Sequence, residues 1–442
     1  MFQNRTTSIG WQPQQSASAD WRPNNVQRLV LGLVWIALAS GSIVFSEPAP
    51  DDALTLGLLV LLPAVGLVAM PGPLWLVLAV WLVCAASGFV ASAQSLDPDK
   101  STSHTAISLY LYASLFMMAA FVAKRPQVHT KLILDAYLWA AFISAIAGVV
   151  GYFGLAPGAA ELFTKADRAA GMFKDPNVYG PFMGPAILYA LHRILNERAA
   201  RTVLPAAMLL VMAVATLVSF SRGAWINIAI AVAVYTYGAI VLARSEQQQA
   251  RIIVLGTLAI GAAVGMLAIA AQLDQVSGLL SSRAALTQSY DEGPQGRFGG
   301  QFQALMMILE HPLGLGALQF GTHYHHEDVH NVYISMFHNA GWLGGLLFAV
   351  MMASTVVYGA RHLIRATPTQ PYFLIAYAAL LGNVVEGFVV DTDHWRHLYL
   401  LLAIVWGLMV SEQVVARVAS SLRPKPSRPA RIVAQWQAGA IA

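Results

Sequence analysis

Charge is scarce in this chain. Charged residues make up 11% of its 442 residues, whereas hydrophobic residues make up 57%. A soluble domain carries about 25% charged residues, so the composition excludes an ordinary soluble protein and indicates a polytopic membrane protein. The one cysteine, Cys84, lies in an apolar run, which excludes an intrachain disulfide and a thiolate metal cluster. The first 25 residues are polar and lack an apolar core, so we expect no cleavable signal peptide. No pattern typical of nucleic-acid binding is present.

What the chain does contain is a series of about twelve apolar runs, each long enough to cross a hydrocarbon core about 30 Å thick. The runs are rich in Leu, Ala, Val, Ile and Gly and do not alternate with polar residues, which favours helices over spanning strands. We therefore predict an all-α fold, a polytopic transmembrane helical bundle of about 12 spans. The expected spans are 27–45, 54–70, 73–92, 106–123, 131–153, 178–195, 202–219, 223–242, 252–271, 332–357, 371–390 and 396–414.

Most of the 26 Lys and Arg residues fall in alternate gaps between these runs. Because cations concentrate on the cytoplasmic side of membrane proteins, both termini are expected in the cytoplasm. The predicted organisation is a cytoplasmic tail 1–26, a transmembrane catalytic domain 27–414 and a cytoplasmic tail 415–442.

Two segments on the expected periplasmic side are long, 154–177 and 272–331. The second contains a short amphipathic helix, about 297–310, before His311-Pro312. A long loop with structure of its own is usually functional. The cations that break the charge pattern lie on this side: Lys100, Lys165, Arg168, Lys174, Arg222, Arg283, Arg297 and Arg396.

Cations are scarce on the periplasmic side of membrane proteins, and binding of an anionic ligand would explain those found here. Arg222 lies in SFSRGAW at a short hairpin, where its planar guanidinium is suited to grip a phosphate at the membrane surface. Arg297 begins the loop helix, where its charge opposes the macrodipole but joins free N–H groups in an anion cradle. The alternatives are an Arg222 that snorkels to lipid headgroups, and solvated charges at Arg168 and Lys174.

The stretch HYHHEDVHN, residues 323–331, supports two interpretations. One is a metal site, although the spacing matches no strong zinc signature. The other is a single working imidazole, His330, next to a span that begins at Asn331 and beside Arg222. Nearby Arg side chains would keep such an imidazole neutral and able to accept a proton from a hydroxyl. A helix-capping or interfacial histidine is the structural alternative. The potential metal ligands are His323, His325, His326, Glu327, Asp328 and His330.

A further polar group comprises Glu386, Asp391, Asp393, His394 and Arg396. Ionisable residues at membrane depth are functional candidates. We favour the alternative that these residues pair among themselves and close the last outer hairpin.

Four segments in this order resemble the O-antigen ligase and O-antigen polymerase family. They are RAAGMFKDPNVYGPF, SFSRGAW, GRFGGQFQALMMILEHPLGLG and HNVYISMFHNAGWLGG. The resemblance covers about residues 165–350 by motif and the whole chain by number of spans. It implies a GT-C-like bundle in the bacterial inner membrane, and a metal-independent glycosyltransferase without a cofactor. The implied donor is an undecaprenyl-diphosphate-linked glycan, used on the periplasmic side.

Carried over by motif, the resemblance implies that Arg222 and Arg297 hold the diphosphate, helped by Arg168, and that His330 is the base. Lys174 would support the site, and Asn331 and Tyr333 complete an HN-x-Y pattern without an assigned role. Attack opposite the leaving group predicts inversion. The chain departs from the family at His338 and has extra histidines, His323, His325 and His326, which leaves a local regulatory or metal role open.

The expected acceptor is lipid A-core, as in an O-antigen ligase. The alternative is an O-antigen or exopolysaccharide polymerase, whose acceptor is another lipid-linked glycan. A transporter or flippase fits less well, because the ionisable residues gather on one face and not at the membrane midplane.

Overall fold

The computed structural model describes residues 21–273, 276–280 and 293–421. Most of the predicted tail 1–26, the end of the tail 415–442 and parts of the loop 272–331 therefore lie outside the described residues. Within them, each of the twelve expected spans coincides with a helix, which confirms a helical bundle.

Among the described residues, six helices are long and apolar enough to cross a membrane by length and composition. That the other helices at the expected spans also cross the membrane stays a prediction. The six are α3 (Gly72–Ala93), α4 (Pro98–Lys124), α5 (Pro126–Tyr152), α9 (Arg222–Val241), α10 (Glu246–Ala270) and α13 (Val332–Ala360). The remaining helices at expected spans are α1 (Asn25–Ser40), α2 (Pro50–Ala64), α7 (Pro176–Asn196), α8 (Val203–Val218), α14 (Gln370–Glu386) and α15 (Arg396–Ser421).

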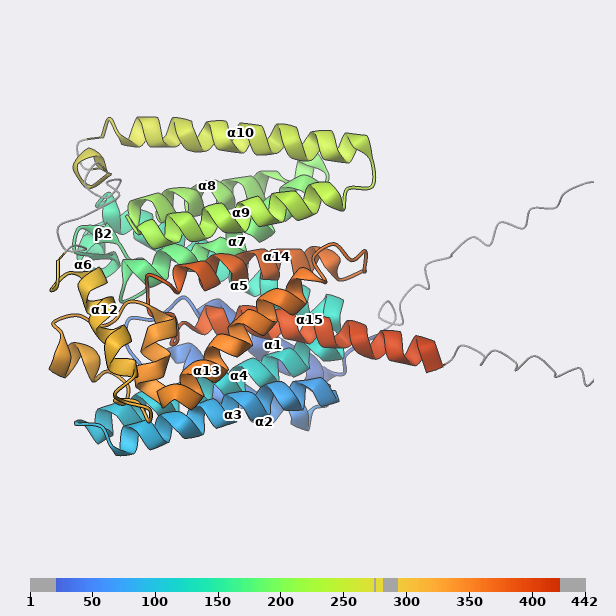
Figure 1. The fold of residues 1–442 in the computed structure, drawn as a ribbon. Coiled ribbons are helices and arrows are strands. Elements are labelled where there is room, and N and C mark those ends of the chain that lie inside the picture. The colour runs from blue at the N-terminus through green and yellow to red at the C-terminus, as the bar shows by residue number, and fades with distance from the viewer. Residues whose placement is uncertain (1–20, 274–275, 281–292, 422–442) are drawn as a thin grey trace, which may run out of the picture.

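The helices pack side by side with α10 along one edge (Figure 1). The closest neighbours are α4 with α15, α9 with α14, α3 with α13 and α7 with α8. The segments that connect the expected outer ends gather at one end of the bundle, on the left in Figure 1. Three of the helices that start at this end, α7, α9 and α13, are capped by the side chains of Asp175, Ser221 and Asn331.

The structure is mostly helical, as predicted, and the outer segment 154–177 adds a small element that the sequence did not predict. This segment contains a short helix, α6 (Ala159–Phe163), and a two-stranded antiparallel hairpin of β1 (Thr164–Lys165) and β2 (Arg168–Ala169). The two turn residues, Ala166 and Asp167, both have positive φ, as a two-residue hairpin of the right-handed twist requires. Ala-Asp lacks the Asn-Gly signature of such turns, so the sequence gives no signal for it.

The predicted amphipathic helix is confirmed. α12 spans Arg297–Ile308, and the chain then runs through a glycine-rich turn to a π-helical turn, η2 (Phe320–Tyr324), before α13.

The expectation that the last outer hairpin pairs within itself is wrong. Arg396 donates from Nε and Nη2 to the two carboxylate oxygens of Asp52 in α2, over 2.8 and 2.6 Å. Glu386 accepts a hydrogen bond from Asn227 of α9 over 2.7 Å, and Asp393 lies 3.2 Å from His104 Nε2 of α4. These side chains leave the hairpin in different directions, so each one fastens it to a different helix.

We predict that Arg396→Gln lowers the free energy of unfolding by about 2–3 kcal/mol, because hydrogen bonds to charged groups are each worth about 1.5–3 kcal/mol. The matched control is Lys131→Gln, which breaks the more exposed pair with Asp135 in α5 and should change stability by less than about 1 kcal/mol. Thermal unfolding in detergent micelles measures both. Equal effects of the two substitutions would contradict a stabilising role for the Arg396 pair.

Candidate functional site

The SFSRGAW motif forms a tight hairpin between two helices. α8 ends at Val218 and α9 begins at Arg222, with Ser221 as its N-cap and Phe220 in the left-handed region at φ +47°. Arg222 is therefore the first residue of α9, at the end of the bundle where the outer segments gather (Figure 1). The dipole of this helix end adds to the positive potential around its guanidinium.

Arg168 fastens the first outer segment to this hairpin. Its side chain is buried; Nε donates to the carbonyl oxygen of Ser219 over 2.7 Å, and Nη2 donates to Asn177 Oδ1 over 2.8 Å. Since these donors bind protein groups, Arg168 holds the hairpin that carries Arg222.

Lys174, the predicted supporting residue, points elsewhere. Its Nζ lies 3.4 Å from a carboxylate oxygen of Glu47, in the connection between α1 and α2, and both side chains are about half exposed.

Hydrogen bonds to the backbone hold His330 in place. Its N–H donates to Asp391 Oδ2 over 2.9 Å, and its carbonyl oxygen accepts from Gln301 Nε2 over 3.1 Å. The neighbouring N–H of Asn331 donates to Asp391 Oδ1 over 3.2 Å. His330 thus sits between the turn after α14 and the helix α12, which begins at Arg297.

Asn331 and Tyr333 have structural contacts. Asn331 Oδ1 accepts from the N–H groups of Tyr333 and Ile334, so Asn331 caps α13. The hydroxyl of Tyr333 donates to the carbonyl oxygen of Val384 over 2.7 Å. Both residues fix the start of α13 against α14.

A short series of contacts joins His330 to the Arg222 hairpin. The N–H of Val332 donates to the carbonyl oxygen of Gly387 over 2.8 Å, at the end of α14. The preceding residue, Glu386, is buried and packs against α9 so closely that a Cβ at Gly223 would lie 2.6 Å from Glu386 Oε1. The start of α13 and the start of α9 therefore flank the same end of α14.

The charges around His330 control its protonation. Burial lowers the pKa of His330 below its usual value of 6.5, and the positive charge of Arg297 lowers it further. The carboxylates of Glu327, Asp328 and Asp175 act in the opposite direction but do not reverse the shift. The imidazole is consequently neutral at pH 7 and can accept a proton.

Asp391 is a residue of this site that the sequence did not assign to it. Besides the two N–H groups, it accepts a hydrogen bond from Ser335, and its Oδ2 lies 3.9 Å from His330 Nδ1. Burial raises the pKa of Asp391 to about 7, and the nearby Asp393 carboxyl adds to this shift. On the other side of the ring, Glu327 Oε2 lies 3.9 Å from His330 Nε2.

Left-handed backbone residues mark the same region. Among the described residues other than glycine, φ is positive at Ala166, Asp167, Phe220, Leu318 and His330. Four of these five either form the predicted site or lie within two residues of Arg168 or Arg222. Such backbone conformations cost about 1 kcal/mol or more; Ala166 and Asp167 form the turn of the β1–β2 hairpin, whereas Phe220 and His330 lie at the candidate site.

Among the described residues, the potential metal ligands that lie close together are outside the histidine-rich stretch 323–331. His323 and His326 are exposed, whereas His325 is buried and stacks on Phe320. In the part of the chain that the structure describes, the three potential ligands that lie within 4.8 Å of one another are His104, Asp393 and His394. They join the last outer hairpin to α4.

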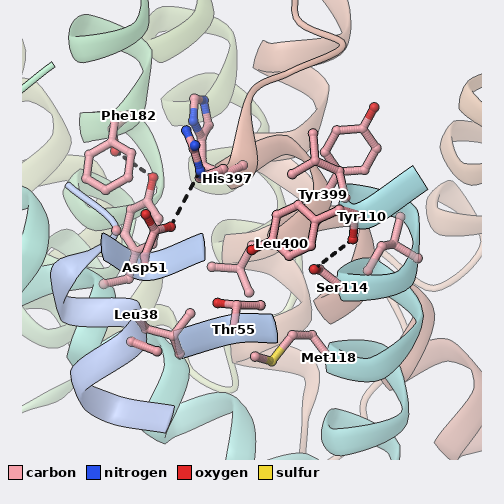
Figure 2. A pocket seen from close by; sticks show the side chains of 16 residues that line it. Leu38, Asp51, Thr55, Tyr110, Ser114, Met118, Phe182, His397, Tyr399 and Leu400 are labelled. Atoms are coloured by element: carbon pink, nitrogen blue, oxygen red, sulfur yellow. Dashed lines mark hydrogen bonds and ion pairs between the residues drawn. The ribbon is translucent and has the colours of Figure 1, made fainter. Parts of the chain in front are cut away.

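Two cavities lie outside this region. The first, about 70 Å³, is a largely apolar space between α1, α2, α4 and α15, with Asp51 at its edge near Arg396 (Figure 2). The second, about 450 Å³, includes His192 and Arg244 and lies at the opposite helix ends. Neither is lined by the predicted site residues.

The fold and the site define a class: a multi-pass membrane protein with a neutral imidazole and helix-terminal arginines at one end. Residues 207–349 match the family model described as O-antigen ligase. This segment, about a third of the chain, is similar to the O-antigen ligase and polymerase family of membrane enzymes. The matched segment contains Arg222, Arg297 and His330, whereas Arg168 and Asp391 lie outside it. No curated protein matches the chain.

We predict that Gly223→Ala destabilises the protein by about 1–3 kcal/mol, because overpacking a buried contact costs that much and Asn227 fixes the Glu386 carboxylate that the new methyl group would meet. The control is Gly256→Ala in α10, where a Cβ meets nothing within 4 Å and helix propensity predicts no loss. Thermal unfolding compares the two. A neutral Gly223→Ala would contradict the close approach of α9 and α14.

Proposed function

We propose that the protein is an inverting membrane glycosyltransferase of the O-antigen ligase type. It transfers a glycan from a polyprenyl-diphosphate donor to a hydroxyl of lipid A-core on the periplasmic side of the inner membrane. The observation that carries this proposal is the setting of His330: a neutral imidazole between two carboxylates, close to the charge of Arg297. The family match supports the class of reaction.

His330 acts as the general base. In this proposal Nε2 accepts the proton of the acceptor hydroxyl, with Asp391 near Nδ1 and Glu327 near Nε2. The imidazolium that forms is stabilised by the carboxylates of Asp391 and Glu327. A positioned base of this kind typically contributes roughly 10²–10⁴-fold to the rate.

Arg222 and Arg297 bind the diphosphate. Each is the first residue of a helix, α9 or α12, so that each guanidinium adds to the positive end of a helix dipole. Negative charge grows on the diphosphate as the glycosidic bond breaks, and fixed cations can lower the barrier by several kcal/mol. Arg168 contributes by holding the hairpin of Arg222.

The reaction balances without an oxidant or a further reactant. The acceptor oxygen forms a bond to the anomeric carbon, and the bond from that carbon to the diphosphate oxygen breaks. The proton passes from the acceptor hydroxyl to His330, and the diphosphate leaves as an anion on its lipid. Attack from the face opposite the leaving group inverts the anomeric carbon.

We predict that His330→Ala lowers transfer by at least about 10²-fold, because it removes the base. The assay uses purified protein in detergent with lipid-linked glycan and lipid A-core. The control is His323→Ala, an exposed histidine of the same stretch, which should retain activity. Normal transfer by His330→Ala would exclude it as the base, and long lipid-linked chains as the product would identify a polymerase.

The two arginines have a separate test in the same assay. Arg222→Ala and Arg297→Ala should each lower transfer by about 10²-fold or more, because each removes a cation from the diphosphate. Arg201→Ala, an exposed cation at the other helix ends, is the matched control and should retain activity. Activity lost on addition of a chelator and restored by zinc would contradict metal independence.

The pH dependence tests the electrostatics. Because burial and Arg297 lower the pKa of His330, wild-type activity should rise with pH through an inflection below pH 6.5 and level off near neutral pH. Glu327→Gln removes a charge that raises this pKa, so the inflection should move to lower pH. Glu310→Gln is the control. An unchanged inflection in Glu327→Gln would contradict His330 as the titrating group.

A further inference from the structure

The exposed face of α12 is apolar. Phe298, Phe302, Leu305 and Leu309 are each at least half exposed, and their spacing places them on one stripe of the helix. A helix that lay over a site in open water would show polar residues on this face. Four large hydrophobic side chains in a row therefore need a partner that removes them from water.

The opposite face of α12 turns toward the candidate site. Gly300 and Ala304 are buried, and Gln301 donates to the carbonyl oxygen of His330. The carbonyl oxygen of Ala304 lies 2.9 Å from His338 Nε2 of α13. The helix thus separates its apolar stripe from the residues around His330.

The contacts between α12 and α13 indicate how deep α12 lies relative to the membrane. The helix α13 is broken at Ala340 and Gly341, where φ is −136° and +65°. The part after the break, residues 342–360, is about 19 residues or roughly 28 Å long, which matches a hydrocarbon core about 30 Å thick. Its first residue, Trp342, donates from Nε1 to the carbonyl oxygen of Ile308 over 2.7 Å. The last turn of α12 therefore lies at the level where the span begins, a level at which Trp is enriched.

The apolar surface of α12 is continuous with that of the span. On α13, Trp342, Leu343 and Leu346 are each about half exposed, and Leu343 and Leu346 share a face of the helix. The N–H of Trp342 also donates to the carbonyl oxygen of Pro312, just after α12. An exposed apolar surface that runs from a membrane span onto a neighbouring helix faces one solvent along its length, and for the span that solvent is lipid.

We propose that α12 lies in the interface of the outer leaflet, with the stripe Phe298, Phe302, Leu305 and Leu309 in the acyl-chain region. This places His330 and Arg297 at headgroup depth, where the phosphate groups of a membrane lipid reside. The inference needs only that α13 spans the bilayer, and it stands whether or not the protein transfers a glycan. Interfacial helices of this kind bind through their buried apolar area.

Spin labels test the depth of the stripe directly. Cys84→Ala removes the one native cysteine, and Phe302→Cys and Gln303→Cys place labels on adjacent residues, one in the stripe and one whose side chain bonds to Tyr324 outside it. In lipid nanodiscs, the label at 302 should be several-fold more accessible to oxygen than to a water-soluble nickel chelate. The label at 303 should show the reverse preference. Leu309→Cys repeats the measurement two stripe positions further along.

Three results would overturn the proposal. A label at 302 that the nickel chelate reaches as readily as the label at 303 would place the stripe in water. A label shielded from both reagents would mean that protein covers the stripe, and dipolar broadening between labels would identify a second copy of the chain. None of these results depends on substrate, so they are distinct from a failure of the proposed glycan transfer.

Discussion

The candidate site depends on the hydrogen bonds that Asp391 accepts from the backbone of the turn before α13. One carboxylate accepts from the N–H groups of His330 and Asn331 and from the hydroxyl of Ser335. These bonds hold His330 in a left-handed conformation that a histidine adopts only with support from its surroundings. They also bring a carboxylate to the imidazole, so that in the proposed mechanism the residue that positions the base would also stabilise its charged form.

The other parts of the candidate site lie at the N-termini of helices. The helices α7, α9 and α13 start at the same end of the bundle, where α12 also lies (Figure 1). Each beginning carries a partial positive charge of about half an elementary charge, and α9 and α12 add an arginine at their first position. Together they favour an anion over a neutral ligand. The carboxylates of Glu327 and Asp391 lie at the ring of His330, where a positive charge would form in the proposed proton transfer.

The sequence predicted those parts of the site that break a general rule. Arg222 and Arg297 stood out because they lie where cations are scarce, and His330 because it directly precedes a span. The helix α12 was predictable from its amphipathic pattern, although not that its exposed face carries large hydrophobic side chains. The resemblance to the family, confirmed over residues 207–349, covers the same three residues.

The parts that were missed depend on contacts between distant segments. Arg168 was expected to bind diphosphate, yet it donates to the carbonyl oxygen of Ser219, 51 positions away in the chain. Asp391 binds a backbone 61 positions away, and Arg396 pairs with Asp52 across 344 positions. Local pattern carries no information on such pairs, which is why the last hairpin was expected to pair within itself.

The most direct test of the account is an experimental structure of the full chain in lipid nanodiscs with undecaprenyl diphosphate bound. The account predicts density for the diphosphate between the beginnings of α9 and α12, with its oxygens within hydrogen-bonding distance of Arg222 and Arg297 and with His330 facing the same space. A diphosphate bound at the opposite helix ends, in the cavity beside Arg244, would contradict it.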